Sequence, residues 1–383
     1  MKTVPQDLYQ YLCDMYRKLH QCPEIGFDLW QTTAIVAAEL DAMGIPYTDQ
    51  YAQCSLVGTI GNKEGVPTIG LRADMDALPI TEDVDIPFKS KNDGAMHACG
   101  HDSHTAILLT VAKVLKSREA ELPCNVKLFF QPSEECAVSG AKTMADNGCL
   151  EGVEAVLAVH CETPLQPNTI GYCAGDAMAA CIPMTLKFYG KSAHATIPQN
   201  GIDAIAMAVE AYNRLKEMVK DEAGDRPYIW SVGKFAGGEV HNIICDEVTE
   251  EISFRFFDEP FALRVMAKAE EICQDVAQKF GGRYELKWKI SAVAVHNNEK
   301  LVEKLCSVVE KLDGIKLQYV PRRNSSEDFA WFLREVPGVL FRYGSGDITK
   351  GIVETAHNPK FRINEEGMKA AVLAFVNFVL EYN

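Results

Sequence analysis

The chain has 383 residues, of which 47% are hydrophobic and 24% are charged, and its formal net charge is −15. This length predicts two domains, each with enough apolar residues for a core of its own. The acidic balance disfavours nucleic acid and anionic membrane surfaces as partners, because both attract basic faces, and it does not restrict a small-molecule substrate.

Cysteine usage and the first residues predict the compartment. The 13 cysteines are an odd number scattered along the sequence. The first residues lack the apolar stretch and small-residue cleavage site of a signal peptide, and no apolar run reaches the length of a transmembrane helix. We therefore expect reduced, mostly buried thiols in a cytoplasmic protein.

The first 160 residues alternate between helical and strand patterns. Apolar residues at helical spacing predict helices over residues 8–19, 32–43 and 107–115. Short β-rich runs predict strands over residues 55–60, 68–71, 125–130 and 155–159. This alternation predicts an α/β domain with a mostly parallel sheet flanked by helices.

Acidic and histidine residues follow three of these strands. Asp74 follows the second strand, Glu134 and Glu135 follow the third, and His160 follows the fourth. Ligands of open α/β sheets bind outside the carboxyl ends of the strands. These four residues are therefore expected to converge although they are far apart in the sequence.

The pattern changes after residue 177. Strands are predicted over residues 183–189, 228–235, 248–257 and 284–293, and helices over residues 204–219 and 262–280. This β-α-β-β-α-β order is typical of a ferredoxin-like α+β domain, which we assign to residues 178–292. A helix at 301–312, a strand at 337–341 and a helix at 365–380 complete the first domain. That domain is therefore discontinuous and comprises residues 1–177 and 293–383.

Residues 96–105 contain three of the nine histidines of the chain, together with one cysteine and one aspartate. Cys99 and His101 lie two residues apart in a Gly-containing turn, so both side chains can reach one centre. Thiolate and imidazole suit Zn, Ni, Co or Fe, and carboxylates from elsewhere admit Mn. A structural zinc site would need paired Cys-x-x-Cys knuckles, which the sequence lacks.

Each candidate also has an ordinary interpretation. A lone His is more often a satisfied polar residue than a ligand, and Cys99 alone is typical of a buried small residue. Glu134 and Glu135 alone would be a common surface pair, Asp74 could cap a turn, and His357 could be a loop residue. Together they favour a catalytic metal site, in which one Glu binds metal and its neighbour takes a proton from water.

Seven segments distributed over nearly the whole chain resemble the metallopeptidase and amidohydrolase family that includes the aminoacylases. Within that family, the sequence resembles the branch of N-acyl-amino acid and auxin-conjugate amidohydrolases, to which the Cys-Gly-His-Asp-x-His-Thr block at residues 99–105 is quite specific. The matching segments are residues 17–24, 72–79, 96–105, 131–135, 190–195, 326–329 and 357–361.

The resemblance implies a catalytic centre with two divalent metal ions per subunit, which would be Zn, Mn, Co or Ni. It implies a general base at Glu134 and an acid at Asp74 that orients a metal-binding residue. Asp102 and His104 become supporting or helix-start residues, and His97 has no assigned function. The implied ligands are Cys99 as the bridging ligand, His101, Glu135, His160 and His357.

The resemblance also implies functions for the inserted domain, which is expected to form a homodimer and to close over a small-molecule substrate as a lid. His194 matches a residue that reaches the partner's active site and stabilises the oxyanion of the reaction. Asn242 and Arg255 match positions that hold the substrate's carboxylate, and a strand-face salt bridge is the alternative for Arg255.

Two features depart from the family pattern. Residues 136–140 replace a Gly-rich turn, and Cys245 stands where Pro is common. Neither departure changes the implied metal ligands, so both concern the shape of the pocket.

The expected function is metal-dependent hydrolysis of the amide bond of N-acyl amino acids or of dipeptide-like amides. The alternatives are deacetylation of N-acetyldiaminopimelate in lysine biosynthesis, a small-peptide carboxypeptidase or dipeptidase, and a non-catalytic binding protein on the same scaffold. The complete set of implied ligands, together with Glu134, disfavours the last alternative.

Overall fold

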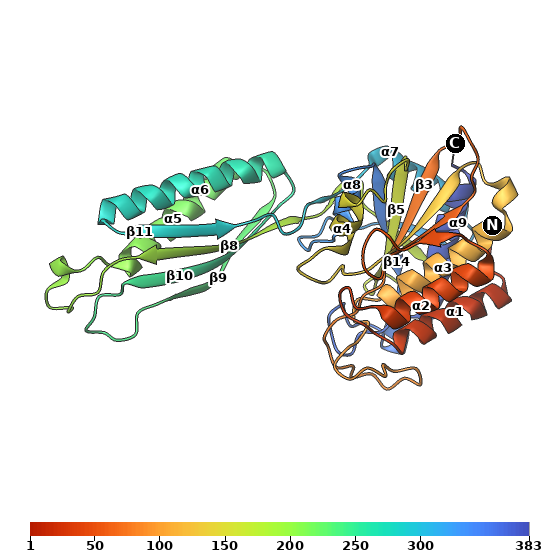
Figure 1. The fold of residues 1–383 in the computed structure, drawn as a ribbon, viewed down its shortest axis with the longest axis horizontal. Coiled ribbons are helices and arrows are strands. Elements are labelled where there is room, and N and C mark those ends of the chain that lie inside the picture. Colours follow the sequence, from red (N-terminus) through yellow and green to blue (C-terminus); the bar gives the residue numbers. More distant parts are fainter. Residues whose placement is uncertain (383) are drawn as a thin grey trace. The chain divides into compact units, whose positions relative to one another are not determined.

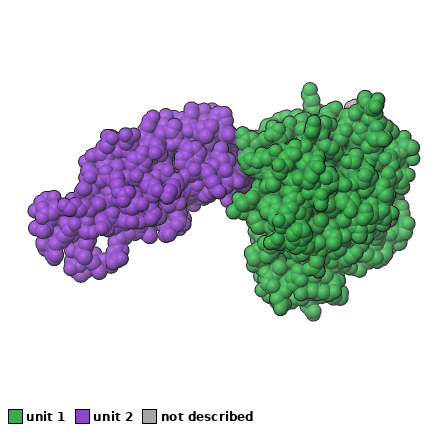
Figure 2. Space-filling view, in the orientation of Figure 1, with its two compact units in different colours: residues 1–177, 295–321, 328–383 green, residues 178–294, 322–327 purple. Residues whose placement is uncertain are grey.

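The computed structural model describes residues 1–382, which form two compact units (Figure 2). Unit 1 comprises Met1–Ala177, Val295–Pro321 and residues 328–382, and unit 2 comprises Met178–Ala294 and Arg322–Glu327. The sequence patterns did not assign the short segment Arg322–Glu327 to the inserted domain. It belongs to unit 2 because the N–H of Ala179 donates hydrogen bonds to the carbonyl groups of Arg323 and Ser325.

An eight-stranded sheet in the order β1-β2-β4-β3-β5-β14-β6-β13 forms the centre of unit 1 (Figure 1). Its middle strands are parallel: β3 pairs with β4 and β5, and β5 pairs with β14. The predicted α/β fold with a mostly parallel sheet is therefore confirmed. The strands are β1 Tyr47–Thr48, β2 Leu56–Ile60, β3 Thr68–Asp74, β4 Asn125–Gln131, β5 Ala155–Glu162, β6 Thr169–Tyr172, β13 Lys316–Tyr319 and β14 Gly338–Gly344.

The helix α3 (His101–Ser117) is the central helix of unit 1. Nearly all of its residues are buried, because it packs against β3 and β5 on one side and against α1, α2 and α9 on the other. A small two-stranded sheet joins β7 (Gly175–Met178) to β12 (Val295–Asn297). The other helices of unit 1 are α1 Gln6–His20, α2 Trp30–Met43, α4 Gly140–Asp146, α7 Glu299–Val309, α8 Ala330–Leu333 and α9 Met368–Leu380.

Unit 2 contains a four-stranded antiparallel sheet in the order β11-β8-β10-β9, with α5 and α6 on one face (Figure 1). Buried and more exposed residues alternate along β8 and β10, because only the face toward the helices is covered. The predicted ferredoxin-like order is confirmed. Its elements are β8 Ala180–Tyr189, α5 Ala204–Ala223, β9 Tyr228–Gly237, β10 Glu247–Phe256, α6 Glu259–Phe280 and β11 Arg283–Trp288.

Strand ends differ from the predicted ones at positions that matter for the site. The strand β3 includes Asp74, and β5 continues past His160 to Glu162, so both residues lie within strands. The strand predicted over residues 284–293 ends at Trp288. Among residues 1–382, no helix combines the length and the apolar composition needed to cross a membrane.

Candidate metal centre

The segment that carries Cys99 and His101 enters α3 through a glycine that no other residue can replace without strain. Gly100 has a φ of +82°, and a Cβ at this position would lie 2.6 Å from the Sγ of Cys161. Glycine accepts both the left-handed backbone and the close approach to β5. The turn therefore places Cys99 and His101 at the N-terminal end of α3, opposite β5.

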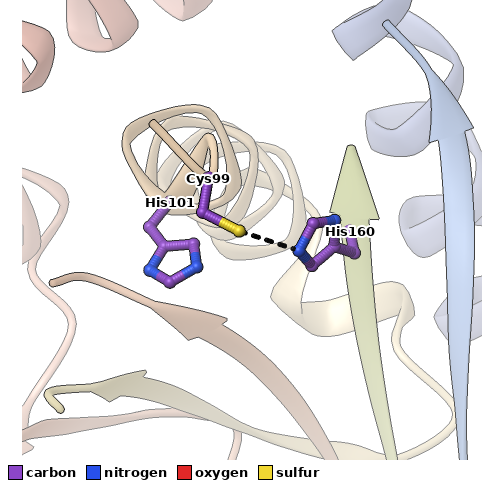
Figure 3. A group of neighbouring side chains, drawn as sticks. All are labelled: Cys99, His101 and His160. Atoms are coloured by element: carbon purple, nitrogen blue, oxygen red, sulfur yellow. Dashed lines mark hydrogen bonds between the residues drawn. The ribbon is translucent and has the colours of Figure 1, made fainter. Parts of the chain in front are cut away.

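Cys99 lies next to His160 of β5 (Figure 3), and its Sγ is 3.4 Å from the Nε2 of His160. The Nδ1 of His160 lies 2.7 Å from the carbonyl oxygen of Cys161. A carbonyl oxygen only accepts hydrogen bonds, so Nδ1 carries the proton. Nε2 therefore directs its lone pair toward Cys99, which is the tautomer of a metal-ligating histidine.

The acidic side of the site follows β4. The N–H groups of Glu134 and Glu135 donate hydrogen bonds of 3.0 Å to the two carboxylate oxygens of Asp76. Glu134 Oε2 and Glu135 Oε1 each lie 3.9 Å from His101 Nε2. Asp76 therefore holds the two glutamates toward His101, a function that the sequence analysis did not assign. The sequence did carry a signal, because two acids, Asp74 and Asp76, stand at and just after the end of β3.

The loop that carries His357 is fixed to the same place. His357 has a φ of +69°, an uncommon conformation for a residue with a Cβ. Its N–H donates a 2.8 Å hydrogen bond to the carbonyl of Ala98, one residue before Cys99. Its Nε2 lies 3.0 Å from Glu135 Oε1. The backbone contact with Ala98 therefore brings His357 to Glu135.

The structure thus gathers the five residues proposed from the sequence as metal ligands. Within each of three groups, the possible ligand atoms all lie within 4.8 Å of one another. Cys99, His101 and Glu135 each belong to two of these groups, so the three groups adjoin one another. The groups are Cys99, His101 and His160; Cys99, Glu135 and His357; and His101, Glu134 and Glu135.

Burial determines the charge of these side chains. Burial raises the pKa of the Cys99 thiol well above its usual value, so a thiolate here needs a cation beside it. Burial lowers the pKa of His160 well below its usual value, so the ring is neutral. For Glu135, burial raises the pKa, but the hydrogen bond with His357 and the charge of His101 outweigh it and lower the pKa.

His101 provides a direct test of whether a metal ion fits. Both of its ring nitrogens are buried, and neither makes a hydrogen bond within residues 1–382. The nearest carboxylate oxygens lie 3.3 Å from Nδ1, in Asp76, and 3.7 Å from Nε2, in Asp74. Buried polar atoms nearly always have a partner. A divalent ion would supply one, and the surrounding thiol, imidazole and carboxylate groups are suitable donors.

His104 is close to these groups, but both of its nitrogens are already engaged by protein atoms. Its Nδ1 lies 2.7 Å from Asp74 Oδ1, and its Nε2 accepts a 2.9 Å hydrogen bond from the N–H of Cys161. His104 therefore connects α3 to the backbone of β5 next to His160. Asp74 also accepts a 2.7 Å hydrogen bond from Arg72, so its closest partners are these two residues.

A buried network reaches Glu134 from the opposite side. The N–H of Asp328 donates a 3.3 Å hydrogen bond to Glu134 Oε1. The carboxylate of Asp328 accepts hydrogen bonds from Arg72 at 2.9 Å and from the Ser139 hydroxyl at 2.7 Å. Ser139 also caps α4 by accepting from the N–H of Lys142. Residues 136–140, which differ from the Gly-rich turn of the family pattern, thus help through Ser139 to hold the backbone of Asp328 beside Glu134.

The other three predicted site residues belong to unit 2. His194 forms an isolated antiparallel bridge with Ile243, and the N–H of Ala195 donates a 3.0 Å hydrogen bond to the carbonyl of Asn242. The segments of His194 and Asn242 are therefore adjacent. Arg255, on β10, donates 3.1 Å hydrogen bonds to the carbonyl of Asn324 and to the hydroxyl of Ser326.

Comparison with known proteins gives consistent matches over the chain. Residues 70–381 match Peptidase family M20/M25/M40. The N-acetyl-L-cysteine deacetylase of Bacillus subtilis (strain 168) is 33% identical over 362 residues, covering 94% of this chain and 85% of that protein. The IAA-amino acid hydrolase ILR1-like 2 of Arabidopsis thaliana is 32% identical over 381 residues, covering 98% and 86%.

A solved structure agrees with these matches. The Bacillus subtilis YXEP protein, described as a dinuclear metal binding peptidase from the M20 family, aligns with a TM-score of 0.86 at 29% sequence identity. The alignment covers 98% of each chain, so it includes both units.

Proposed function

Since the chain belongs to Peptidase family M20/M25/M40 and is an amide hydrolase, we propose that it cleaves the amide bond of N-acyl amino acids at a centre of two divalent metal ions. The observation that carries this proposal is the convergence of Cys99, His101, Glu135, His160 and His357 beside Glu134. Relatives named for N-acetyl-L-cysteine and for IAA-amino acids support an N-acyl amino acid as the substrate.

The five converging residues would hold the two ions, with Cys99 between them. When bound, such ions lower the pKa of water and polarise the scissile carbonyl group. The donor set admits Zn, Mn, Co or Ni. The thiol of Cys99, whose pKa is raised by burial, would ionise as it binds.

Glu134 is the proposed general base. Its backbone is held by Asp76, and its Oε1 accepts from the N–H of Asp328, so its carboxylate has a defined position. Oε2 lies 3.9 Å from His101 Nε2, beside the proposed ligands. Glu134 would take a proton from the attacking water and give it to the leaving amine.

Unit 2 would complete the site in a homodimer. His194 would donate a hydrogen bond to the developing oxyanion in the partner's site, and Asn242 and Arg255 would bind the substrate's carboxylate. One Arg255 nitrogen donates to Ser326 and Asn324, which would limit the guanidinium to a few orientations. Asp74 would support the site through His104.

The sheet edge of unit 2 supports dimer formation. The strand β9 has ten residues and lies at the end of the sheet, where it pairs with β10 on one side. Ile229 and Phe235 on this strand are 36% and 43% exposed, and Ile205 and Val209 on α5 are 40% and 46% exposed. A long edge strand with exposed apolar side chains is usually covered by a partner.

We also propose a cytoplasmic location. Within the described residues no disulfide is formed, although the chain has 13 cysteines. Reduced thiols are typical of proteins of the cytosol.

Metal analysis combined with a substrate panel tests the proposed function. The purified protein is expected to contain about two divalent ions per subunit. After removal of metal and separate reloading with Zn, Mn, Co or Ni, it should hydrolyse members of a panel of N-acyl amino acids, and the metal-free protein should not.

The panel also includes N-acetyldiaminopimelate and small dipeptides. Exclusive cleavage of either would contradict the broader N-acyl amino acid proposal while leaving the amide hydrolase assignment intact. A protein that retains full activity without metal would contradict the proposed centre itself.

A further inference from the structure

A second set of buried charged side chains lies outside the proposed ligands. His20 is the last residue of α1, Glu82 follows β3, and Asp102 lies in the first turn of α3. Their exposed fractions are 2%, 4% and 2%. The proposed mechanism uses none of the three, although Asp102 directly follows His101.

His20 connects the two carboxylates. Its Nδ1 lies 2.6 Å from Asp102 Oδ2, and its Nε2 lies 3.3 Å from Glu82 Oε1. Ionised carboxylates only accept hydrogen bonds, so both ring nitrogens donate and the ring is an imidazolium. Burial lowers the pKa of His20, but the hydrogen bonds to Asp102 and Glu82 outweigh it and raise the pKa to about 9.

Stability alone does not explain this arrangement. Replacing buried ion pairs by well-packed apolar residues is often neutral or stabilising. The ring of His20 also packs beside two aromatic rings, because the ring centroids of Tyr16 and Phe88 lie 5.7 and 5.5 Å from its own. Apolar residues in place of all three charged groups would suit these ring neighbours, so the charged set is better explained by what it orients.

In each carboxylate, the oxygen that does not contact His20 accepts a hydrogen bond from a backbone N–H. These two N–H groups lie before and after the segment that carries Cys99 and His101. Asp102 Oδ1 accepts a 2.8 Å hydrogen bond from the N–H of Ser103 in the first turn of α3. Glu82 Oε2 accepts a 2.7 Å hydrogen bond from the N–H of Ser90, whose hydroxyl donates to the carbonyl of Ala95 at 2.9 Å. Residues 96–101, which carry Cys99 and His101, lie between these two anchors.

We propose that His20 is a positioning residue for the metal ligands: by holding Asp102, it fixes the first turn of α3 and thereby the orientation of Cys99 and His101. This inference rests on the proposed function, because it assumes that these two residues bind metal. His20 itself lies outside the ligand set and acts through the backbone that Asp102 holds.

Two amide substitutions separate positioning from stability. In His20→Asn, the side-chain amide nitrogen takes approximately the place of Nδ1 and can still donate to Asp102. In His20→Gln, it takes approximately the place of Nε2 and can donate only to Glu82. Both variants lose the same charge and one hydrogen bond; they differ in which carboxylate stays bound and in one methylene group.

Titration of metal-free protein with Co²⁺, followed by the visible absorption of the bound ion, measures ligand positioning without any turnover. We expect His20→Asn to bind Co²⁺ nearly as tightly as the wild type and with the same spectrum. Binding by His20→Gln should weaken by about 10- to 100-fold, the usual effect of losing a residue that orients a ligand. Thermal melting of both variants identifies any difference in stability.

Equal Co²⁺ affinity in His20→Gln and the wild type would overturn the positioning function, and so would an equal loss in both variants that follows their melting temperatures. If His20→Gln fails to fold, Asp102→Asn replaces one carboxylate oxygen by an N–H donor with little change in shape. It therefore loses either the contact with His20 or that with the Ser103 N–H, and is expected to weaken Co²⁺ binding likewise. A wild-type protein that binds no Co²⁺ would instead refute the proposed metal centre, so the two failures are distinguishable.

Discussion

Backbone hydrogen bonds decide what each histidine of the site can do. His104 and His160 lie side by side, with ring centroids 4.8 Å apart. His104 uses both nitrogens, on Asp74 and on the N–H of Cys161, whereas His160 uses Nδ1 on the carbonyl of Cys161 and turns Nε2 toward the Cys99 thiol. The N–H and the carbonyl group of Cys161 therefore give the two rings different functions. His104 holds β5 in place, and His160 keeps the lone pair of Nε2 for a metal ion.

The general base is testable with a substitution that preserves shape. In Glu134→Gln, the amide oxygen can still accept from the N–H of Asp328, but the side chain can no longer take a proton. Turnover of N-acyl amino acids should fall by about 10²- to 10⁴-fold, the usual contribution of a general base. Metal content, measured by elemental analysis, should stay near the wild-type value.

The neighbouring residue is the matched control for that test. Glu135→Gln removes a proposed ligand and should reduce metal content together with turnover. If Glu134→Gln turned over substrate at the wild-type rate, the assignment of the base would be wrong.

The site residues divide into those that a sequence can suggest and those that it cannot. Residue types and motif order suggested Cys99 and the other ligands, because metal chemistry restricts which side chains serve. Asp76 and Asp328 were not assigned, because they act on backbone N–H groups of residues 134 and 135 and on side chains of distant elements. The sequence places Asp76 near a strand end, but which backbone groups it holds depends on the fold.

At the scale of single elements, the strand β10 carries an unusual residue. Glu250 is only 1% exposed, and neither of its carboxylate oxygens makes a hydrogen bond within residues 1–382. It shares a face of the strand with Val248 and Ile252, which pack into the apolar core beneath α5 and α6. Burial raises its pKa from 4.5 to about 7.

This residue predicts a pH dependence of stability with a defined sign. Between pH 4.5 and about 7, Glu250 is protonated in the folded protein and ionised in the unfolded chain, so rising pH lowers the free energy of unfolding. The total loss is up to about 3 kcal/mol and is complete above that window. Urea denaturation of Glu250→Gln should therefore show a stability gain over the wild type that grows through the window and then levels off.

Glu251→Gln is the control, because Glu251 lies on the opposite face of the same strand and its side chain is 54% exposed, in an ion pair with Lys234. It should change the pH profile little. A parallel pH profile for Glu250→Gln and the wild type would show that Glu250 does not titrate in this range.

Elements with a long periodic pattern were predictable, and short ones were not. The helices α5 and α6 and the strands β8 and β10 extend over ten or more residues, which is enough for alternation to appear. The strands β6, β7, β12 and β13 have three or four residues each. Pairing with neighbouring strands stabilises them, and that pairing is a property of the tertiary structure.

At the scale of the whole molecule, the chain enters unit 2 twice. The main insertion, Met178–Ala294, follows from its own strand and helix patterns, whereas Arg322–Glu327 belongs to unit 2 through backbone contacts with Ala179. That short segment also supplies Ser326, which binds Arg255. No pattern within six residues could have assigned it to either unit.

The proposed dimer makes its strongest prediction when two inactive variants are mixed. If His194 acts in the partner's site, a heterodimer of Glu134→Ala and His194→Ala contains one site with both substitutions and one site with neither. Unfolding and refolding an equal mixture should then recover about a quarter of wild-type activity, since half of the dimers are mixed and each has one intact site.

The alternative arrangement gives the opposite result. If His194 served the site of its own subunit, every site in the mixture would lack one of the two residues, and no activity would return. Each variant refolded alone is the control and should stay inactive in both cases. Recovery of activity therefore depends on a site built from two chains, because neither stability nor metal binding by either variant can restore a missing side chain.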